Sequence, residues 1–425
     1  MFRLMVGLAR ASSRARRFGL CAALCATVLS CGGGGGDSGV STGSSGSSGT
    51  SPPSGSNVAG VVVDTGPSGN SINTLFTTVT VCVPGSTTNC QTIDHIQVDT
   101  MSYGLRILAS VLTISLPVQA APTGGSLAEC TAFADGYSWG PVALADMQIS
   151  GESASSVPVQ VIGASNFTNV PADCSGVGPA EDTVAQFGAN GIIGVGVFAQ
   201  DCGSGCLATD NGTYYVCTTA SAQCQPTAVA SLANEVTNPI TYFAADNNGV
   251  IIQLPSVASA GAATLSGYMI FGIDTQTNNK SGSQSILTVA SSGSNAGDFT
   301  TVFNGQNLTM SFLDTGSNGF FFNDSNITAC TDSGFTDFYC PTSPQALTAT
   351  LQGENGISAS ESFSVGDAET IAQDDAAFGL LAGTFPGPDA STTFDWGLPF
   401  YYGRTVYTAI QGDVTAVGTG PYVAF

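Results

Sequence analysis

The sequence predicts an all-β protein made of two similar halves. Short runs rich in β-branched and apolar residues, separated by clusters of Gly, Asn, Asp and Pro, predict strands at residues 75–83, 93–98, 157–162, 268–273 and 308–313. No stretch shows a long helical periodicity, and residues 227–235 are the one candidate for a short helix. A pattern in which an apolar strand ends at Asp-Thr occurs once in each half. This repeat indicates a pseudo-twofold axis.

The clearer copy of this pattern lies in the second half. The run 308–313 leads directly into Asp314, Thr315, Gly316 and Ser317. A strand would deliver Asp314 to a turn so tight that Gly316 is needed for its missing Cβ. Thr315 and Ser317 can hydrogen-bond to the carboxylate or brace the turn around it. Taken alone, such a turn is equally compatible with a capping carboxylate in an ordinary β protein.

The first half carries a second copy with one departure. The run 93–98 leads into Asp99, Thr100, Met101 and Ser102, so Met101 stands where the other copy has glycine. The backbone N–H of Met101 can still donate to Asp99, but its long side chain enters a crowded turn. An apolar strand with glycine follows each Asp turn, at residues 191–194 and 394–397. This order predicts two carboxylates, one from each half, at a shared site.

The N-terminal segment predicts export. In residues 1–30, five arginines precede an apolar stretch too short to span a bilayer, which is typical of a secretory signal peptide. Cys31 follows a small residue, which favours a lipid-anchored cysteine, with ordinary cleavage nearby as the alternative. Residues 31–57 are mostly Gly, Ser, Thr and Pro and predict a flexible tether. We therefore expect a protein anchored in a bacterial envelope (outer membrane, periplasm or cell surface) or secreted.

The charge is strongly one-sided. After the signal peptide, only Arg106, Lys280 and Arg404 oppose 30 acidic residues. Nucleic acid and anionic membrane surfaces are therefore excluded as partners, and the membrane is reached only through the predicted anchor. Few cations would remain to repel one another in acid, so the composition is compatible with acid tolerance. It is equally compatible with simple solubility.

Ten cysteines after the signal peptide predict up to five disulfides in an oxidising compartment. They are Cys82, Cys90, Cys130, Cys174, Cys202, Cys206, Cys217, Cys224, Cys330 and Cys340. Local loops at Cys82–Cys90 and Cys330–Cys340 are plausible, although the sequence does not fix the pairing. The Cys202–Cys206 and Cys217–Cys224 spacings suggest zinc, but with a single histidine in the chain disulfides are favoured. No metal site is predicted.

Two further residues are candidates of lower weight. Asp64 lies in an Asp-Thr-Gly tripeptide, but this comes before the strand predicted at residues 75–83, well ahead of the Asp99 turn. We therefore interpret it as an ordinary turn after an entry strand. His95 is the only histidine, and no G-x-S-x-G turn accompanies it in the folded part. A structural or exposed role is therefore predicted for His95.

Several motifs, in the correct order over residues 58–425, resemble those of the pepsin-like aspartic peptidases. Besides the two Asp turns, Tyr137-Ser138-Trp139-Gly140 resembles their flap hairpin, and Gly-Ile-Ile-Gly-Val-Gly at residues 191–196 resembles the stretch that closes the first lobe's active-site loop. Residues 267–274 resemble the segment that leads into the second lobe, and residues 394–402 resemble that lobe's Leu-Gly-Asp segment and tyrosine-rich strand. The sequence is also similar to uncharacterised proteobacterial exported proteins, which would make it a distant branch.

The resemblance implies a bilobal, pepsin-like double β-barrel, with an N-terminal lobe over residues 58–264 and a C-terminal lobe over residues 265–425. It implies that Asp99 and Asp314 share a proton, so that one activates water while the other polarises the scissile carbonyl. The implied supporting residues are Thr100, Thr315, Ser102, Ser317 and Gly316, and the implied flap residues are Tyr137 and Trp139. No cofactor is needed for this chemistry.

Three functions remain open at the level of the sequence. The first is an aspartic endopeptidase, a monomer that acts on peptides or proteins at acid pH. The second is a catalytically inactive pepsin-like protein that binds peptides or a surface partner, which the departure at Met101 favours. The third is an adhesin-like β protein, which the composition permits. Apolar residues near the cleft, Trp139 and residues 320–322 among them, could favour apolar substrate side chains, with core packing as the alternative.

Overall fold

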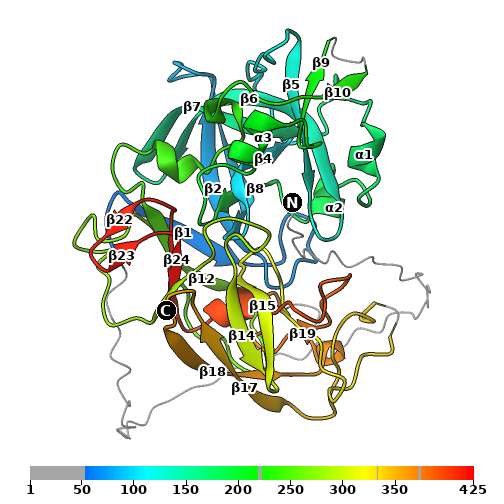
Figure 1. The fold of residues 1–425 in the computed structure, drawn as a ribbon, viewed down its shortest axis with the longest axis vertical. Coiled ribbons are helices and arrows are strands. Elements are labelled where there is room, and N and C mark those ends of the chain that lie inside the picture. Colours follow the sequence, from blue (N-terminus) through cyan, green and yellow to red (C-terminus); the bar gives the residue numbers. More distant parts are fainter. Residues whose placement is uncertain (1–52, 219–222, 333, 372–374) are drawn as a thin grey trace, which may run out of the picture.

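The computed structural model describes residues 53–218, 223–332, 334–371 and 375–425 (Figure 1). The predicted signal peptide, Cys31 and most of the predicted tether therefore lie outside the described residues. Asn57 is buried and donates from its amide to the carbonyl of Phe271 at 2.9 Å, so the packed body has begun at this residue. No helix in the described ranges is long and apolar enough to cross a membrane.

The chain is mostly β, with one closed six-stranded barrel, a second nearly closed barrel and a few short helices, which confirms the predicted fold class. In Figure 1 the first barrel forms the upper part of the molecule and the second barrel the lower part, with β1 and β12 between them. Two lobes therefore face each other across the middle of the protein.

The first barrel is closed because β6 pairs with both β7 and β2. Its strands, in order around the ring, are β6 (Tyr137–Ile149), β7 (Glu152–Ile162), β4 (Tyr103–Leu108), β8 (Gly191–Val195), β3 (Cys90–Asp99) and β2 (Leu75–Cys82). The long β6 continues beyond the barrel and pairs with β5 (Ser126–Ala132), to which β9 (Tyr214–Cys217) and β10 (Cys224–Pro226) are added.

A linking sheet joins the two lobes. Its order is β1 (Val58–Val63), β12 (Leu265–Phe271), β11 (Gly249–Gln253), β21 (Thr405–Ala409), β24 (Tyr422–Ala424) and β13 (Ile286–Thr288). The N-terminal strand β1 pairs along its whole length with β12, from Val58 opposite Ile270 to Val63 opposite Leu265. The predicted lobe boundary after residue 264 falls between β11 and β12, two neighbouring strands of this sheet.

The second barrel is built from seven strands. Their order is β18 (Ser358–Val365), β17 (Gln345–Gln352), β14 (Phe299–Phe303), β15 (Gln306–Leu313), β20 (Asp395–Trp396), β16 (Phe320–Phe321) and β19 (Ala382–Gly383). A separate two-stranded ribbon, β22 (Val414–Thr415) and β23 (Gly418–Thr419), lies near the C-terminus.

Aromatic side chains fill the second barrel. The ring of Phe394 stacks on Phe322 with centroids 4.6 Å apart and on Trp396 at 4.2 Å. The indole N–H of Trp396 donates to Thr301 Oγ1 at 3.0 Å, so this buried donor has a partner. Each such side chain contributes about 1.5–3 kcal/mol through removal of apolar surface from water. Phe320 and Phe322 therefore serve the core, rather than a substrate site.

Helical structure in the described part of the chain is limited to single turns. They are α1 (Ala172–Ser175), α2 (Val184–Phe187), α3 (Ser204–Ala208) and four 3₁₀ turns, η1 (Leu232–Asn234), η2 (Pro239–Tyr242), η3 (Ala368–Thr370) and η4 (Leu398–Tyr401). The helix considered for residues 227–235 is therefore wrong except for η1. The η1 helix ends after one turn because the backbone of Glu235 is extended. The Glu235 carboxylate accepts the N–H of Gly203 at 2.7 Å.

The described residues form five disulfides, which use all ten of the cysteines after the predicted signal peptide other than Cys31, and the two local loops considered plausible are among them. They are Cys82–Cys90, Cys130–Cys174, Cys202–Cys206, Cys217–Cys224 and Cys330–Cys340. Both spacings that suggested zinc are thus disulfide loops. Multiple disulfides indicate a protein that folds outside the cytoplasm.

Candidate active site

The two Asp turns follow strands with equivalent surroundings. β3 ends at Asp99 and runs parallel to β8, where Asp99 lies opposite Gly194. β15 ends immediately before Asp314 and runs parallel to β20, where Leu313 lies opposite Trp396. In each half, the strand that carries the Asp turn is paired with the apolar strand that the sequence repeat singled out. This pairing fixes the position of each turn at the centre of the molecule.

The two turns are tied together by the threonines that follow the aspartates. Thr100 Oγ1 donates to the carbonyl of Leu313 at 3.0 Å, and Thr315 Oγ1 donates to the carbonyl of Val98 at 2.7 Å. The N–H of Thr315 also donates to Thr100 Oγ1 at 3.1 Å, and the Tyr401 hydroxyl lies 3.0 Å from the same oxygen. All of these groups are buried. Each threonine therefore locks its own turn to the strand of the other half.

Asp99 is held by its own turn. Its Oδ1 accepts hydrogen bonds from the N–H of Met101 at 2.6 Å and of Ser102 at 2.9 Å. Met101 does not have a positive φ, so a side chain at this position causes no backbone strain. That side chain is buried and packs in a cluster with Phe312 and Phe321 of the second lobe. Met101 thus retains the backbone donor and adds an apolar contact between the lobes.

Gly316 brings the second carboxyl group close to the first. Asp314 Oδ1 accepts the N–H of Gly316 at 2.7 Å, and Asp314 Oδ2 accepts the Ser317 hydroxyl at 2.8 Å. A Cβ on Gly316 would lie 2.7 Å from Asp99 Oδ2 and 3.0 Å from Asp314 Oδ1. Both oxygens therefore approach the same small space, which is open only because residue 316 has no side chain.

Burial and proximity keep these carboxyl groups from ionising together. Burial raises the pKa of Asp99, although hydrogen bonds from Met101, Ser102 and Asp314 oppose this effect. Burial, followed by the charges of Asp99 and Asp395, raises the pKa of Asp314 well above its usual value. Asp99 Oδ2 is buried and has no hydrogen bond of suitable geometry among the described residues, with the Ser102 hydroxyl and the Asp314 carboxyl as its nearby donors. A protonated Asp314 that donates to Asp99 satisfies both groups.

A third buried carboxyl group belongs to the same region. Asp395 is fully buried in β20. It lies opposite Phe312, and Phe312 is two residues before Asp314 in the chain. Neither of its oxygens has a hydrogen bond with suitable geometry among the described residues. Burial, with the charge of Asp99, raises the pKa of Asp395 well above the usual value, although the Ser317 hydroxyl opposes this effect. Asp395 lies within residues 394–397, which the sequence repeat singled out as the apolar strand that follows the second Asp turn.

A cavity of about 240 Å³ opens in front of the two turns, lined by Asp99 and Gly316 among others. The turn of the β5–β6 hairpin covers it with Phe133 and Asp135. The predicted flap residue Tyr137 is the first residue of β6, and neither it nor Trp139 lines this cavity.

Tyr137 and Trp139 instead pack in a buried cluster with Cys130, Cys174 and Phe167. The indole N–H of Trp139 donates to the carbonyl of Phe167 at 2.8 Å. The residues at the hairpin tip are thus those that sequence reasoning missed. Asp135-Gly136 is a turn signal that marks the tip.

A second cavity, of about 630 Å³, lies beside Met101 and Ser102 and reaches Arg106. Arg106 is fully buried, and its guanidinium contacts Glu129 Oε1 at 2.6 Å and Asp201 Oδ2 at 3.1 Å. Glu129 Oε2 has no partner among the described residues. One cation thus holds two buried carboxylates, which anchors β4 to β5 behind the first Asp turn.

The remaining candidate residues lie apart from this site. Asp64 follows β1 and accepts the N–H of Gly66 at 2.8 Å, the ordinary turn expected for it. His95 Nε2 lies 3.3 Å from Asp64 Oδ2, so the histidine braces that turn.

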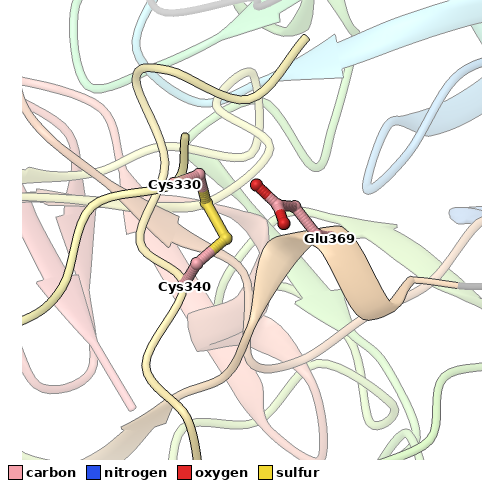
Figure 2. A group of neighbouring side chains, drawn as sticks. All are labelled: Cys330, Cys340 and Glu369. Carbon is pink, nitrogen blue, oxygen red and sulfur yellow. A yellow bond between two sulfur atoms is a disulfide. The ribbon is translucent and has the colours of Figure 1, made fainter. Parts of the chain in front are cut away.

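Figure 2 shows Cys330, Cys340 and Glu369. In the described ranges, this is the one group of three His, Cys, Asp or Glu side chains whose metal-ligating atoms lie within 4.8 Å of one another. The two sulfurs are bonded to each other and offer no thiolate to a metal ion. The Glu369 carboxylate instead accepts the N–H of Asp332 at 3.1 Å and of Thr331 at 3.3 Å. It therefore braces the disulfide loop.

Comparisons with known proteins give a family but no function. No curated protein matches the chain. Residues 53–425, which include every strand and both Asp turns, match the family described as "Protein of unknown function (DUF3443)". The chain belongs to this DUF3443 family.

Proposed function

We propose that this protein is an exported aspartic peptidase of pepsin-like fold, in which Asp99 and Asp314 hydrolyse peptide bonds. The observation that carries the proposal is the convergence of Asp99 Oδ2 and Asp314 Oδ1 on the space left by Gly316. The threonine interlock and the matching strand pairs support a pseudo-twofold site.

The geometry gives each carboxyl group a role. Asp314, whose pKa is raised further by the charges of Asp99 and Asp395 in addition to burial, carries the shared proton. Asp99, which lines the cavity, is the base that takes a proton from water. The water oxygen then adds to the scissile carbonyl carbon while Asp314 gives its proton to the carbonyl oxygen. Asp99 then passes the proton that it took from water to the leaving nitrogen, and a hydroxyl of the tetrahedral intermediate returns a proton to Asp314. The C–N bond breaks without a covalent intermediate.

Proteolysis of an unfolded protein tests this proposal. The purified full chain should cleave such a substrate between about pH 3 and about pH 8, with the greatest rate on the acid side, because one carboxyl group must keep a proton. Asp314→Asn should lower the rate by at least about 10³-fold, since it removes an acid that acts in the transition state. The matched control is Asp389→Asn, at an exposed site where the hydrogen bonds from Thr392 and Thr393 go to the backbone carbonyl, which the substitution keeps. Equal rates for wild type and Asp314→Asn would contradict the proposal.

The second candidate is an inactive pepsin-like protein that binds peptides. It is favoured by the complete burial of Asp314, which lines neither of the two cavities described above, and by the Met101 side chain between the lobes. A folded protein that binds peptides but cleaves none at any pH would establish it in place of the peptidase. For the location, we propose that Cys31 carries the lipid anchor, which mass spectrometry of the mature N-terminus would show.

A further inference from the structure

The cavity at Asp99 has an unusual charge. The described residues that line it include four carboxylates, Asp99, Asp135, Glu181 and Asp337, and no lysine, arginine or histidine. The three basic residues of the mature sequence are engaged elsewhere. Arg106 pairs with Glu129, Arg404 pairs with Glu361, and Lys280 donates to the carbonyl of Asp274. The negative charge of the cavity is therefore not balanced by the described part of the chain.

Two of these carboxyl groups are buried and are not fully satisfied by hydrogen bonds from the described residues. Glu181 is only 9 % exposed, and no N–H or O–H in the described ranges donates to its side chain at hydrogen-bond distance. Asp99 has no exposed surface, and its Oδ2 has no hydrogen bond of suitable geometry among the described residues, although the Ser102 hydroxyl and the Asp314 carboxyl are close enough to lower the pKa of Asp99. A buried carboxylate oxygen without a hydrogen-bond donor costs folding free energy. A ligand group that brings both hydrogen-bond donors and a positive charge into the cavity would therefore bind favourably.

Asp135 and Glu181 act as a pair. Glu181 lies beside the hairpin tip, since a Cβ on Gly136 would be 2.8 Å from Glu181 Cγ. Backbone bonds hold the two segments together, because the N–H of Glu181 donates to the carbonyl of Tyr137 at 2.8 Å. Burial raises the pKa of Asp135 to about 7, and burial with the charge of Asp135 raises that of Glu181 to about 8. A bound cation would lower both pKa values.

Aromatic rings supply the other half of the surface. Phe133, Phe187, Phe335 and Phe338 also line the cavity, and Phe133 meets Phe187 edge-to-face with centroids 5.9 Å apart. Long basic side chains combine an apolar stem with a charged end, so the stem can pack on rings while the end reaches carboxylates. A purely apolar side chain would leave the carboxylates unpaired, and an acidic one would be repelled.

We infer that this cavity binds the lysine or arginine side chain of a peptide, and that Glu181 and Asp135 determine this preference. The inference deepens the proposed function, since it names the substrate class at the same site, but binding does not require that the dyad be active. A divalent metal ion is a poorer occupant, because no three of the lining carboxylates bring ligand atoms within 4.8 Å of one another in the described ranges.

Peptide binding to the full-length Asp314→Asn protein tests the inference without interference from cleavage. Three fluorescent peptides would be compared by anisotropy, identical except for one central lysine, norleucine or glutamate. We expect the lysine peptide to bind at least about tenfold more tightly than the norleucine peptide, and the glutamate peptide to bind most weakly. The preference should be larger at about pH 9 than at about pH 5, because both carboxyls ionise as the pH rises through their raised pKa values of about 7 and about 8.

Variants then assign the preference to residues. Glu181→Gln should remove most of the lysine preference, and Asp135→Asn provides a second variant at the tip of the hairpin. Glu354→Gln is the matched control, because Glu354 is exposed and lies outside the cavity. Equal binding of the lysine and norleucine peptides, an unchanged preference in both variants, or no binding of any peptide would overturn the inference. A lysine preference in a wild-type protein that cleaves nothing would support the inference and reject the peptidase proposal.

Discussion

Replacement of Gly316 by alanine is expected to lower peptidase activity by about 100-fold or more, because a displacement near 1 Å of reacting groups has an effect of this size. The added Cβ would lie 2.7 Å from Asp99 Oδ2 and 2.8 Å from Asp99 Cγ, closer than real Cβ contacts. Asp99 cannot move freely, since its Oδ1 is fixed by the N–H groups of Met101 and Ser102. The two carboxyl groups must therefore separate, and the hydrogen bond through which they share a proton is lost.

The stability cost of Gly316→Ala should be about 1–3 kcal/mol, as for other overpacked buried sites, so the variant remains folded. Gly60→Ala is the matched control. Gly60 lies in β1 with no atom within 4 Å of an added Cβ and without a positive φ. Cleavage rates and urea unfolding would be measured for both variants. Wild-type activity in a folded Gly316→Ala protein would show that the carboxyl groups do not act as a pair.

Replacement of Arg106 by methionine should destabilise the protein by about 3–5 kcal/mol near pH 9, because it leaves buried carboxylates without their cation. Glu129 and Asp201 both contact the Arg106 guanidinium, and the side chain of Arg106 is only 1 % exposed. The comparison variant is Arg404→Met. Arg404 pairs with Glu361 at 2.6 Å but is 31 % exposed, so its loss should cost about 1 kcal/mol or less.

The destabilisation by Arg106→Met should shrink as the pH falls. Burial, with the charge of Glu129, raises the pKa of Asp201, and burial raises that of the neighbouring Glu235 to about 7. A carboxyl group with a raised pKa in the folded state favours folding when it is protonated, and this contribution is lost as the pH rises through that pKa. Urea unfolding of wild type and variant at about pH 5 and about pH 9 measures the difference. A loss of stability that is larger at the lower pH would contradict this account.

Local features of the chain could be predicted well from the sequence. The strands at residues 75–83 and 308–313 correspond to β2 and β15, because β-branched runs between turn residues determine a strand without reference to distant partners. The disulfides Cys82–Cys90 and Cys330–Cys340 could also be predicted from local sequence, because each closes a short loop. The two Asp turns also follow from contiguous residues.

Features that depend on distant pairing could not be predicted. Nothing local shows that β1 pairs with β12, two strands about half the chain apart, to begin the linking sheet. The partners of Arg106 come from β5 and from the loop at Asp201. The buried ion pairs therefore could not be predicted from the residues around Arg106 either. Asp395 joins the site only through the register of β20 with β15.

The hairpin over the cavity shows how a small shift changes an interpretation. Tyr137 was predicted to close over the substrate, whereas the tip of the hairpin carries Phe133 and Asp135. Residues 133–136 form the turn that reaches the cavity, whereas Tyr137 already belongs to β6 and packs in the core of the lobe. The Asp135-Gly136 turn signal fixes the tip once the strand register is known. The aromatic side chains of Tyr137 and Trp139 alone did not identify the tip of the hairpin.

The most direct test of a shared catalytic site is a double-mutant comparison of Asp99→Asn and Asp314→Asn. Cleavage of the same unfolded protein would be measured for both single variants, the double variant and wild type, with circular dichroism as the check on folding. Residues that act as a unit are strongly non-additive, so we expect each single variant to lose nearly as much activity as the double variant. Substantial activity in either folded single variant, or losses that multiply in the double variant, would show that Asp99 and Asp314 do not form one site.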